Sequence, residues 1–234
     1  MNLLVAVKSC RRDRALGYHQ AIRDTWGRGL DVRFFMGLPV EERLTAQGPD
    51  VEPDEVILNC KDDYESLPFK TQAILAWSTG RDFDYTFLCD NDTFLKPDKL
   101  YRTDFKKYDY SGRFGEHPEI GSLFEYTDGR GNFYPHCNPW ASGGIGYFLS
   151  KYAAQTVQRY TPQIWAEDMH VGQCLGPYIR CGKISAADLK NFAGVAAWHF
   201  ARYNKYPLYS PEMMYRSWSL GDPQVMYDED RRRR

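Results

Sequence analysis

Residues 85–95 read YTFLCDNDTFL, in which a hydrophobic segment leads directly into Asp90, Asn91 and Asp92. Its β-branched and aromatic residues favour a β-strand, and its continuous apolar character is typical of a parallel strand buried on both faces. Similar short apolar runs occur earlier in the chain. We therefore predict strands at 3–7, 32–36, 55–58 and 85–89.

The segments between these runs have helical patterns, which predict helices at 14–26, 39–46 and 68–77. Strands that alternate with helices indicate an α/β fold with crossover helices joining parallel strands. Right-handed crossovers place the C-terminal ends of the strands along one edge, where open α/β sheets bind ligands. Ser9 and Asp90 should share that edge.

The pattern changes after residue 105, where Tyr, Gly, Pro and His become frequent. We predict a short strand at 108–113 and then long loops up to residue 140, which in a compact domain usually line a site. Regular elements return as a strand at 144–149, helices at 150–160 (capped by Ser150) and 165–175, and a strand at 194–200 before an irregular tail. No repeat or linker divides the chain, so a single domain over 1–234 is expected.

Composition excludes several classes of protein. The 234 residues carry a formal charge of -1, so the folded body has no general attraction for polyanions. The basic run Arg231–Arg234 lies in a charged tail at 226–234 and is interpreted as solvated. No segment has the ~20 apolar residues of a membrane span, and there is no signal peptide, so a soluble protein is expected. Six cysteines without a CxxC pair indicate reduced thiols.

The acidic turn after residue 89 is a candidate metal site. Carboxylates just beyond a strand end can present oxygens to a hard divalent cation, which then bridges the two phosphates of a nucleotide. Asp90 and Asp92 are placed for this. The alternative is an ordinary turn, in which Asp and Asn side chains bond their own backbone.

A second acidic pair, Glu167 and Asp168, lies at the predicted start of a helix. A carboxylate there can act as a general base, taking the proton of a hydroxyl that attacks an anomeric carbon. The alternative is a purely structural role, because acids near a helix N-terminus interact favourably with the helix dipole.

His199 stands between Trp198 and Phe200 near a predicted strand end. It is either a core histidine or a nitrogen ligand to the cation held by Asp92. Carboxylate, imidazole and phosphate ligands together favour Mn²⁺ over Mg²⁺ without excluding Mg²⁺.

A glycine-rich run at 143–146 leads into a predicted strand. Glycine allows close approach of the backbone, so Gly143 and Gly144 either contact a ligand or simply permit tight packing. The sequence does not decide between these two roles.

Six blocks of the chain, in order, resemble the family of β-1,3-galactosyltransferases and β-1,3-N-acetylglucosaminyltransferases, to which the fringe proteins are related. The blocks are VKS at 7–9 with Arg14 and AIRDTWG at 21–27, FFMG at 34–37, DDYESLPFKT at 62–71, DND at 90–92, YP at 134–135 with ASGGIGYFLS at 141–150, and EDMHVG at 167–172.

This resemblance implies a fold of the GT-A type, with a Rossmann-like nucleotide-binding half and a mixed central sheet flanked by helices. Residues 1–105 would bind the nucleotide sugar and residues 106–225 the acceptor. The implied activity is metal-dependent and inverting. A sugar of the galactose, N-acetylglucosamine or glucose type would pass from a UDP-sugar to a hydroxyl of a glycan or glycoconjugate.

The resemblance also assigns roles to individual residues. Asp168 would be the base, with Glu167 beside it. The cation, Mn²⁺ or Mg²⁺, would bind Asp92, Asp90 and His199. Ser9, Arg14, Arg23, Lys70, Asp90 and Asn91 would surround the uridine part of the donor, although a structural ion pair is an equally good interpretation of Arg23 and Lys70. His136, Trp140, Gly143 and Gly144 would contact the acceptor.

The chain also departs from this family. It has no membrane anchor, stem or disulfide pattern, so we expect a cytoplasmic enzyme of bacterial or viral type, or an excised catalytic domain. The segment 136–140 is an insertion, and the acceptor therefore cannot be inferred. Two other functions stay open: a transferase acting on modified bases in DNA, and an inactive module that binds a sugar nucleotide or a glycan.

Overall fold

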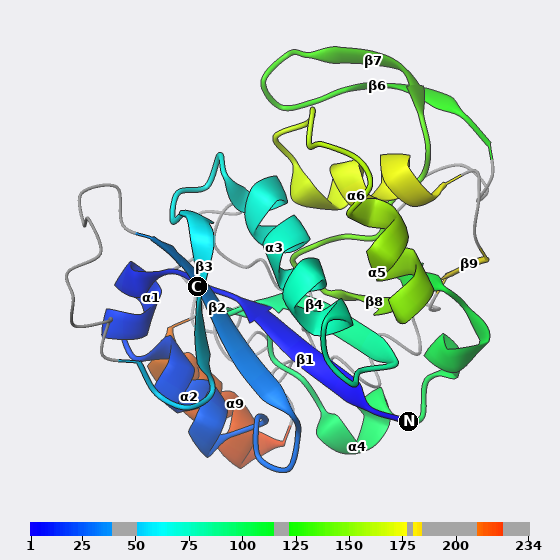
Figure 1. Ribbon diagram of the computed structural model, residues 1–234. Helices are drawn as coiled ribbons and strands as arrows, with labels where there is room; N and C mark the ends of the chain where they lie inside the picture. Colours follow the sequence, from blue (N-terminus) through cyan, green and yellow to red (C-terminus); the bar gives the residue numbers. More distant parts are fainter. Residues whose placement is uncertain (39–50, 115–121, 177–179, 184–209, 222–234) are drawn as a thin grey trace, which may run out of the picture.

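The computed structural model describes residues 1–38, 51–114, 122–176, 180–183 and 210–221 (Figure 1). In this part of the chain, one central sheet has the strand order β3-β2-β1-β4-β8-β5-β9. Four parallel strands are followed by β8, which is antiparallel to both of its neighbours, and by the parallel pair β5 and β9. The strands are β1 (Leu3–Lys8), β2 (Val32–Leu38), β3 (Glu55–Lys61), β4 (Tyr85–Asp90), β5 (Tyr110–Gly112), β8 (Tyr147–Ser150) and β9 (Cys181–Lys183).

The sheet is buried on both faces, as the apolar runs predict. All six residues of β1 are buried; Leu3, Val5 and Val7 pack into one hydrophobic cluster, whereas Leu4 and Ala6 pack into another. Helices cover both faces (Figure 1). The predicted α/β fold with a mixed central sheet flanked by helices is thus confirmed.

Two groups of helices pack on the sheet. On one face, α2 contacts α9, and on the other α3, α5 and α6 contact one another. No helix in the described ranges is long and apolar enough to cross a bilayer. The helices are α1 (Arg11–Ala15), α2 (Tyr18–Asp24), α3 (Leu67–Thr79), α4 (Pro97–Leu100), α5 (Lys151–Val157), α6 (Glu167–Leu175), α9 (Pro211–Leu220) and the 3-10 helix η1 (Asp104–Lys107).

The helix predicted at 14–26 is wrong in detail, because the structure has two short helices, α1 and α2, with Gly17 between them. Gly17 has φ 91°, a left-handed conformation that ends one helix and turns the chain into the next. By contrast, α3 and α6 match their predictions closely, and Ser150 caps α5 by accepting a hydrogen bond from the N–H of Ala153. The predicted helix at 39–46 and strand at 194–200 lie outside the described residues.

The segment predicted as long loops contains a β-hairpin, formed by β6 (Phe124–Thr127) and β7 (Phe133–Cys137). Asp128 closes its turn: the carboxylate accepts hydrogen bonds from the N–H groups of Arg130 and Asn132. It also accepts one from the indole of Trp165, just before α6. The hairpin therefore depends on a contact across 37 residues of sequence. The predicted irregular tail likewise includes a helix, α9.

The strand predicted at 144–149 begins only at Tyr147, because Gly146 has φ 97°. A Cβ at this position would lie 2.4 Å from Cζ of Phe87 and 2.8 Å from the carbonyl oxygen of Leu88. We expect Gly146→Ala to lower the free energy of unfolding by at least about 2 kcal/mol, since overpacking and a left-handed backbone each cost about 1–3 kcal/mol.

Urea unfolding measures this effect. Gly129→Ala is the matched control, because a Cβ there meets nothing within 4 Å. Equal stability of the two variants would show that the chain near Gly146 adjusts without strain.

Candidate functional site

The candidate site lies where β1 and β4 end. These neighbouring parallel strands pair Lys8 with Asp90 in register. One residue further along each strand, the Nδ2 of Asn91 donates to Oγ of Ser9 at 3.0 Å. The prediction that Ser9 and Asp90 share one edge of the sheet is confirmed.

Lys8 connects three parts of this edge. Its side chain is only 2% exposed, and its Nζ lies 3.2 Å from Oδ1 of Asp90 and 3.4 Å from the carbonyl oxygen of Gly143. It also forms an ion pair with Glu167. Burial lowers the pKa of Lys8, but the carboxylates of Asp90 and Glu167 raise it, with the net result well above its ordinary value. Lys8 is therefore a buried cation.

Glu167, the first residue of α6, points inward. It is 4% exposed, and its carboxylate accepts hydrogen bonds from the hydroxyl of Tyr147 at 2.7 Å and that of Thr71 at 3.4 Å. Burial raises the pKa of Glu167, and the ammonium of Lys8 opposes this rise. A buried carboxylate needs such partners, since an unpaired charge in the interior is very costly.

Asp168 is the less buried acid of this pair. Its Oδ2 accepts a hydrogen bond from the N–H of Gly143 at 2.9 Å, and its Oδ1 accepts one from the N–H of Met169 at 2.8 Å. These two donors fix the orientation of the carboxylate at the start of α6.

The glycine run lies between the two acidic clusters. A Cβ on Gly143 would come within 2.2 Å of Oε1 of Glu167 and 3.2 Å of Nζ of Lys8. The carbonyl oxygen of Gly144 accepts a hydrogen bond from Oγ1 of Thr93 at 2.9 Å, which ties the run to the turn after β4. Tight packing thus explains Gly143, and contact of either glycine with an acceptor stays a prediction.

Asp92 stands in that turn, half-buried. Its carboxylate acts on the hydroxyl of Tyr18. Burial raises the pKa of Tyr18 most, the charge of Asp13 adds to this effect and that of Asp92 adds less, so that the pKa reaches about 12. Within the described residues, no three His, Cys, Asp or Glu side chains are grouped so that they could hold a metal ion. Carboxylate oxygens suit Mn²⁺ or Mg²⁺, but phosphate oxygens would have to complete the ligand set. His199 lies outside the described residues.

A buried relay orients the side chain of Asn91. Oγ of Ser9 lies 2.7 Å from Nε2 of His19, whose Nδ1 lies 2.7 Å from Oε1 of Glu55. Burial lowers the pKa of His19, which favours a neutral ring that donates from Nδ1 to Glu55 and accepts from Ser9. The amide of Asn91 donates to Ser9 and also to Asp13, at 3.0 Å each. Both amide hydrogens are thereby used.

The predicted uridine-binding cations are all in ion pairs. Arg14 and Arg23 contact Glu55, with N–O distances of 2.9 and 3.0 Å. Lys70 contacts Asp62 at 2.7 Å and also donates to the carbonyl oxygen of Ser9 at 2.6 Å. Arg23 and Lys70 thus form the structural ion pairs that were the alternative to nucleotide binding. Contact of Arg14, Arg23 or Lys70 with a nucleotide stays a prediction.

Glu55 makes the protein sensitive to acid. Burial raises the pKa of Glu55, but hydrogen bonds from Arg14 and His19 lower it more strongly, from an ordinary 4.5 to about 2. A lowered pKa gives stability that is complete above pH 4.5 and is lost as the pH falls toward 2. We expect Glu55→Gln to be less stable than wild type at pH 7 and to lose less stability between pH 5 and pH 3. Urea unfolding at these pH values tests this, and parallel losses in both proteins would contradict it.

Of the two predicted acceptor residues Trp140 and His136, Trp140 packs between α6 and the hairpin, and His136 belongs to the hairpin itself. Trp140 is 9% exposed and stacks on Phe124 of β6 with ring centroids 5.8 Å apart. A Cβ on Gly172 of α6 would lie 2.5 Å from its Cβ. His136 is an exposed residue of β7. Among the described contacts, none joins these two side chains to Lys8, Asp90 or Asp168, and their acceptor role stays a prediction.

Four residues of this site were not found from the sequence: Lys8, Asp13, His19 and Glu55. Lys8 carried a detectable signal, because a lysine at the end of an otherwise apolar buried strand must find a partner. Asp13 contacts Asn91, His19 contacts Ser9 and Glu55 contacts His19, and these contacts exist only in the tertiary fold.

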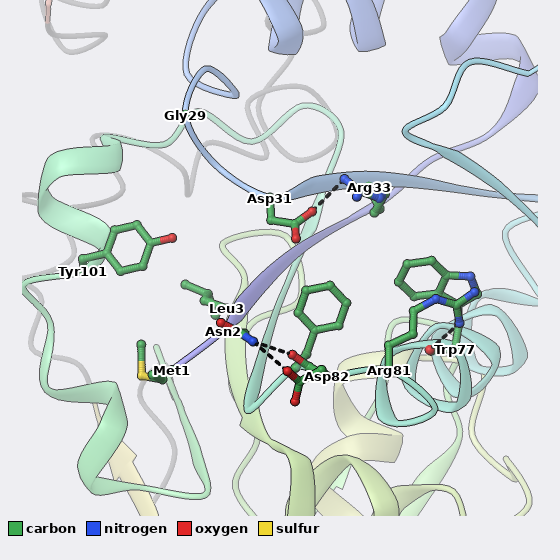
Figure 2. A pocket seen from close by; sticks show the side chains of 11 residues that line it. Met1, Asn2, Leu3, Gly29, Asp31, Arg33, Trp77, Arg81, Asp82 and Tyr101 are labelled. Carbon is green, nitrogen blue, oxygen red and sulfur yellow. Dashed lines mark hydrogen bonds and ion pairs between the residues drawn. The ribbon is translucent and has the colours of Figure 1, made fainter.

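A groove of about 670 Å³ opens at the opposite edge of the sheet. It lies beside Leu3, and Lys8 is roughly 16 Å further along β1 at about 3.3 Å per residue. Figure 2 shows two pairs of polar residues in this groove. Arg33 contacts Asp31 at 2.7 Å, and Asn2 donates to Asp82. The groove is therefore separate from the candidate site at the ends of β1 and β4.

Comparison with known proteins gives similarity in structure only. No family model matches the chain, and no curated protein matches it. Similar solved structures include HddC from Yersinia pseudotuberculosis, at 11% identity and a TM-score of 0.41, covering 79% of this chain and 90% of HddC. A197 from STIV has 11% identity and a TM-score of 0.43, covering 79% of this chain and 82% of A197. The galactosyltransferase LgtC, in complex with donor and acceptor sugar analogues, has 13% identity and a TM-score of 0.41, covering 89% of this chain and 81% of LgtC. These values do not place the chain in a family.

Proposed function

We propose that this protein is a glycosyltransferase of the GT-A type, which transfers a hexose-type sugar from a UDP-sugar to an acceptor hydroxyl with inversion. One observation carries the proposal. The acidic end of β4, at Asp90, and the acidic start of α6, at Glu167, are joined through a single buried ammonium, that of Lys8. This supports the proposal, because the carboxylates to which we assign diphosphate binding and deprotonation of the acceptor lie at one edge of the sheet.

The donor side would be built on Asp92. Bound Mn²⁺ or Mg²⁺ would neutralise the charge that develops on the departing diphosphate. Because Oδ1 of Asp90 already contacts Lys8 at 3.2 Å, Asp92 is the better direct ligand and Asp90 is better suited to the ribose or to water on the cation. His199 would be a further ligand, and Asn91, held by Ser9 and Asp13, would offer its carbonyl oxygen.

The acceptor side would be built on Asp168. As the acceptor oxygen forms its bond to the anomeric carbon, the bond from that carbon to the phosphate oxygen breaks and the hydroxyl proton moves to Asp168. Attack opposite the leaving group inverts the configuration. Asp168 suits this role better than Glu167, since Glu167 is buried and would have to leave its ion pair with Lys8.

A thermal-shift screen tests the proposal. UDP-glucose, UDP-galactose and UDP-N-acetylglucosamine are each added with and without Mn²⁺. A ligand at 100 times its dissociation constant adds about 2.7 kcal/mol of stability, which for a chain of this size raises Tm by roughly 5–10 °C. We expect such a shift for at least one donor, in the presence of Mn²⁺ only. The absence of any shift, together with no release of UDP from any donor, would contradict the proposal.

A further inference from the structure

We infer that Lys8 is a positioning residue that couples the end of β4 to the carboxylate of Asp168, acting through Glu167 and Gly143. This inference rests on the proposed function. In the proposed transferase, Lys8 would fix the position of the donor side of the site relative to the acceptor side.

The first step is the geometry of the ammonium. A lysine side chain has three N–H donors. The ammonium of Lys8 has an acceptor for each of them on three separate parts of the fold: Asp90 at the end of β4, Glu167 at the start of α6, and the carbonyl of Gly143 before β8. With its side chain 2% exposed, Lys8 has almost no contact with water that could replace one of these partners.

The second step leads from Lys8 to Asp168 through Gly143. The carbonyl oxygen of Gly143 faces Nζ of Lys8 at 3.4 Å, and its N–H donates to Oδ2 of Asp168 at 2.9 Å. Gly143 also packs so closely that a Cβ would lie 2.2 Å from Oε1 of Glu167. Loss of Lys8 would remove the hydrogen-bond donor to the carbonyl of Gly143, and we expect this to loosen the segment whose N–H orients Asp168.

The third step is electrostatic. Burial lowers the pKa of Lys8, but the carboxylates of Asp90, Glu167 and Asp168 raise it and so favour the charged form. Without that positive charge, Glu167 would be a buried carboxylate with hydroxyl donors only, beside two further anions. Such an uncompensated charge is far more costly than loss of the whole pair. A variant that removes the charge of Lys8 must therefore also remove the charge of Glu167.

Two variants test the coupling. Glu167→Gln keeps the size of the side chain and leaves Lys8 with Asp90, while the double variant Lys8→Met, Glu167→Gln contains no unpaired buried charge. The control is Ile74→Val, a conservative change at a fully buried position of α3. Each protein is compared by its Tm, by amide hydrogen exchange at Gly143, and by kcat and donor affinity with the UDP-sugar and Mn²⁺.

We expect the Gly143 amide to exchange at least about 10-fold faster in both variants than in wild type, because its bond to Asp168 is weakened. We expect kcat to fall by about 10–100-fold, since small displacements of reacting groups cost this much. In Glu167→Gln, donor affinity should stay within about threefold of wild type. Ile74→Val should lower Tm by a few degrees at most and change neither exchange nor kcat.

The outcomes separate the inference from the proposed function. If wild type transfers no sugar, the proposed function fails, and exchange at Gly143 still decides whether Lys8 and Glu167 hold Asp168. If exchange and kcat in both variants match Ile74→Val, the coupling does not exist and the inference is overturned. A loss of Tm alone, with unchanged exchange at Gly143, also overturns it.

Discussion

Replacing Asp168 by Asn is expected to lower turnover by about 10²–10⁴-fold while donor affinity stays almost unchanged. The amide has nearly the shape of the carboxylate, and its oxygen can still accept the hydrogen bond from Gly143 or Met169. It cannot take a proton from the acceptor hydroxyl. The loss should therefore appear in kcat and not in the binding of UDP-sugar.

Steady-state kinetics with a UDP-sugar and Mn²⁺, together with thermal shifts for donor binding, measure this effect. Asp104→Asn is the matched control, since it makes the same change in the first turn of η1 at a side chain that is 72% exposed. That variant should retain wild-type turnover. If Asp168→Asn retained it as well, Asp168 could not be the base.

Replacing Asp92 by Asn is expected to abolish the Mn²⁺-dependent part of UDP binding and to lower turnover by about 10²–10⁴-fold, because a bound cation supplies several kcal/mol of charge stabilisation. The turn that carries Asp92 is fixed on both sides: Asn91 donates to Ser9 and Asp13, and Thr93 donates to Gly144. A change of one carboxylate to an amide should therefore leave this turn in place.

The measurement is the rise in Tm caused by UDP, with and without Mn²⁺, in wild type and in Asp92→Asn. In Asp92→Asn, UDP should raise Tm by the same amount with and without Mn²⁺. This rise should be as small as the rise that UDP causes in wild type without Mn²⁺. A full Mn²⁺-dependent rise in Asp92→Asn would mean that the cation binds elsewhere.

The strands could be predicted from the sequence because burial on both faces produces continuous apolar runs. This holds for β1 and β4, whose residues are almost all buried. The hairpin of β6 and β7 could not be predicted, because its stability depends on distant partners: Asp128 binds the indole of Trp165, and Phe124 stacks on Trp140. The secondary-structure propensity of a short segment does not reveal contacts with residues that are distant in the sequence.

The same distinction applies to the candidate site. The positions of the acidic turn and of Asp168 could be predicted, since each stands at the end of a recognisable strand or the start of a helix, and their roles stay predictions. Lys8 and Glu167 are separated by 159 residues, and their ion pair exists only after the sheet and α6 have come together. The sequence therefore supplied candidate chemical groups, whereas the fold supplied the connections that hold them in place.

A crystal structure of the protein with UDP and Mn²⁺ would show whether Asp92 and Asp168 line one donor and acceptor site. We expect a cation bound to Asp92, a diphosphate on that cation, and space for a sugar ring between the diphosphate and Asp168. A nucleotide bound instead in the groove beside Leu3 and Tyr101, or Asp92 and Asp168 facing separate cavities, would contradict it.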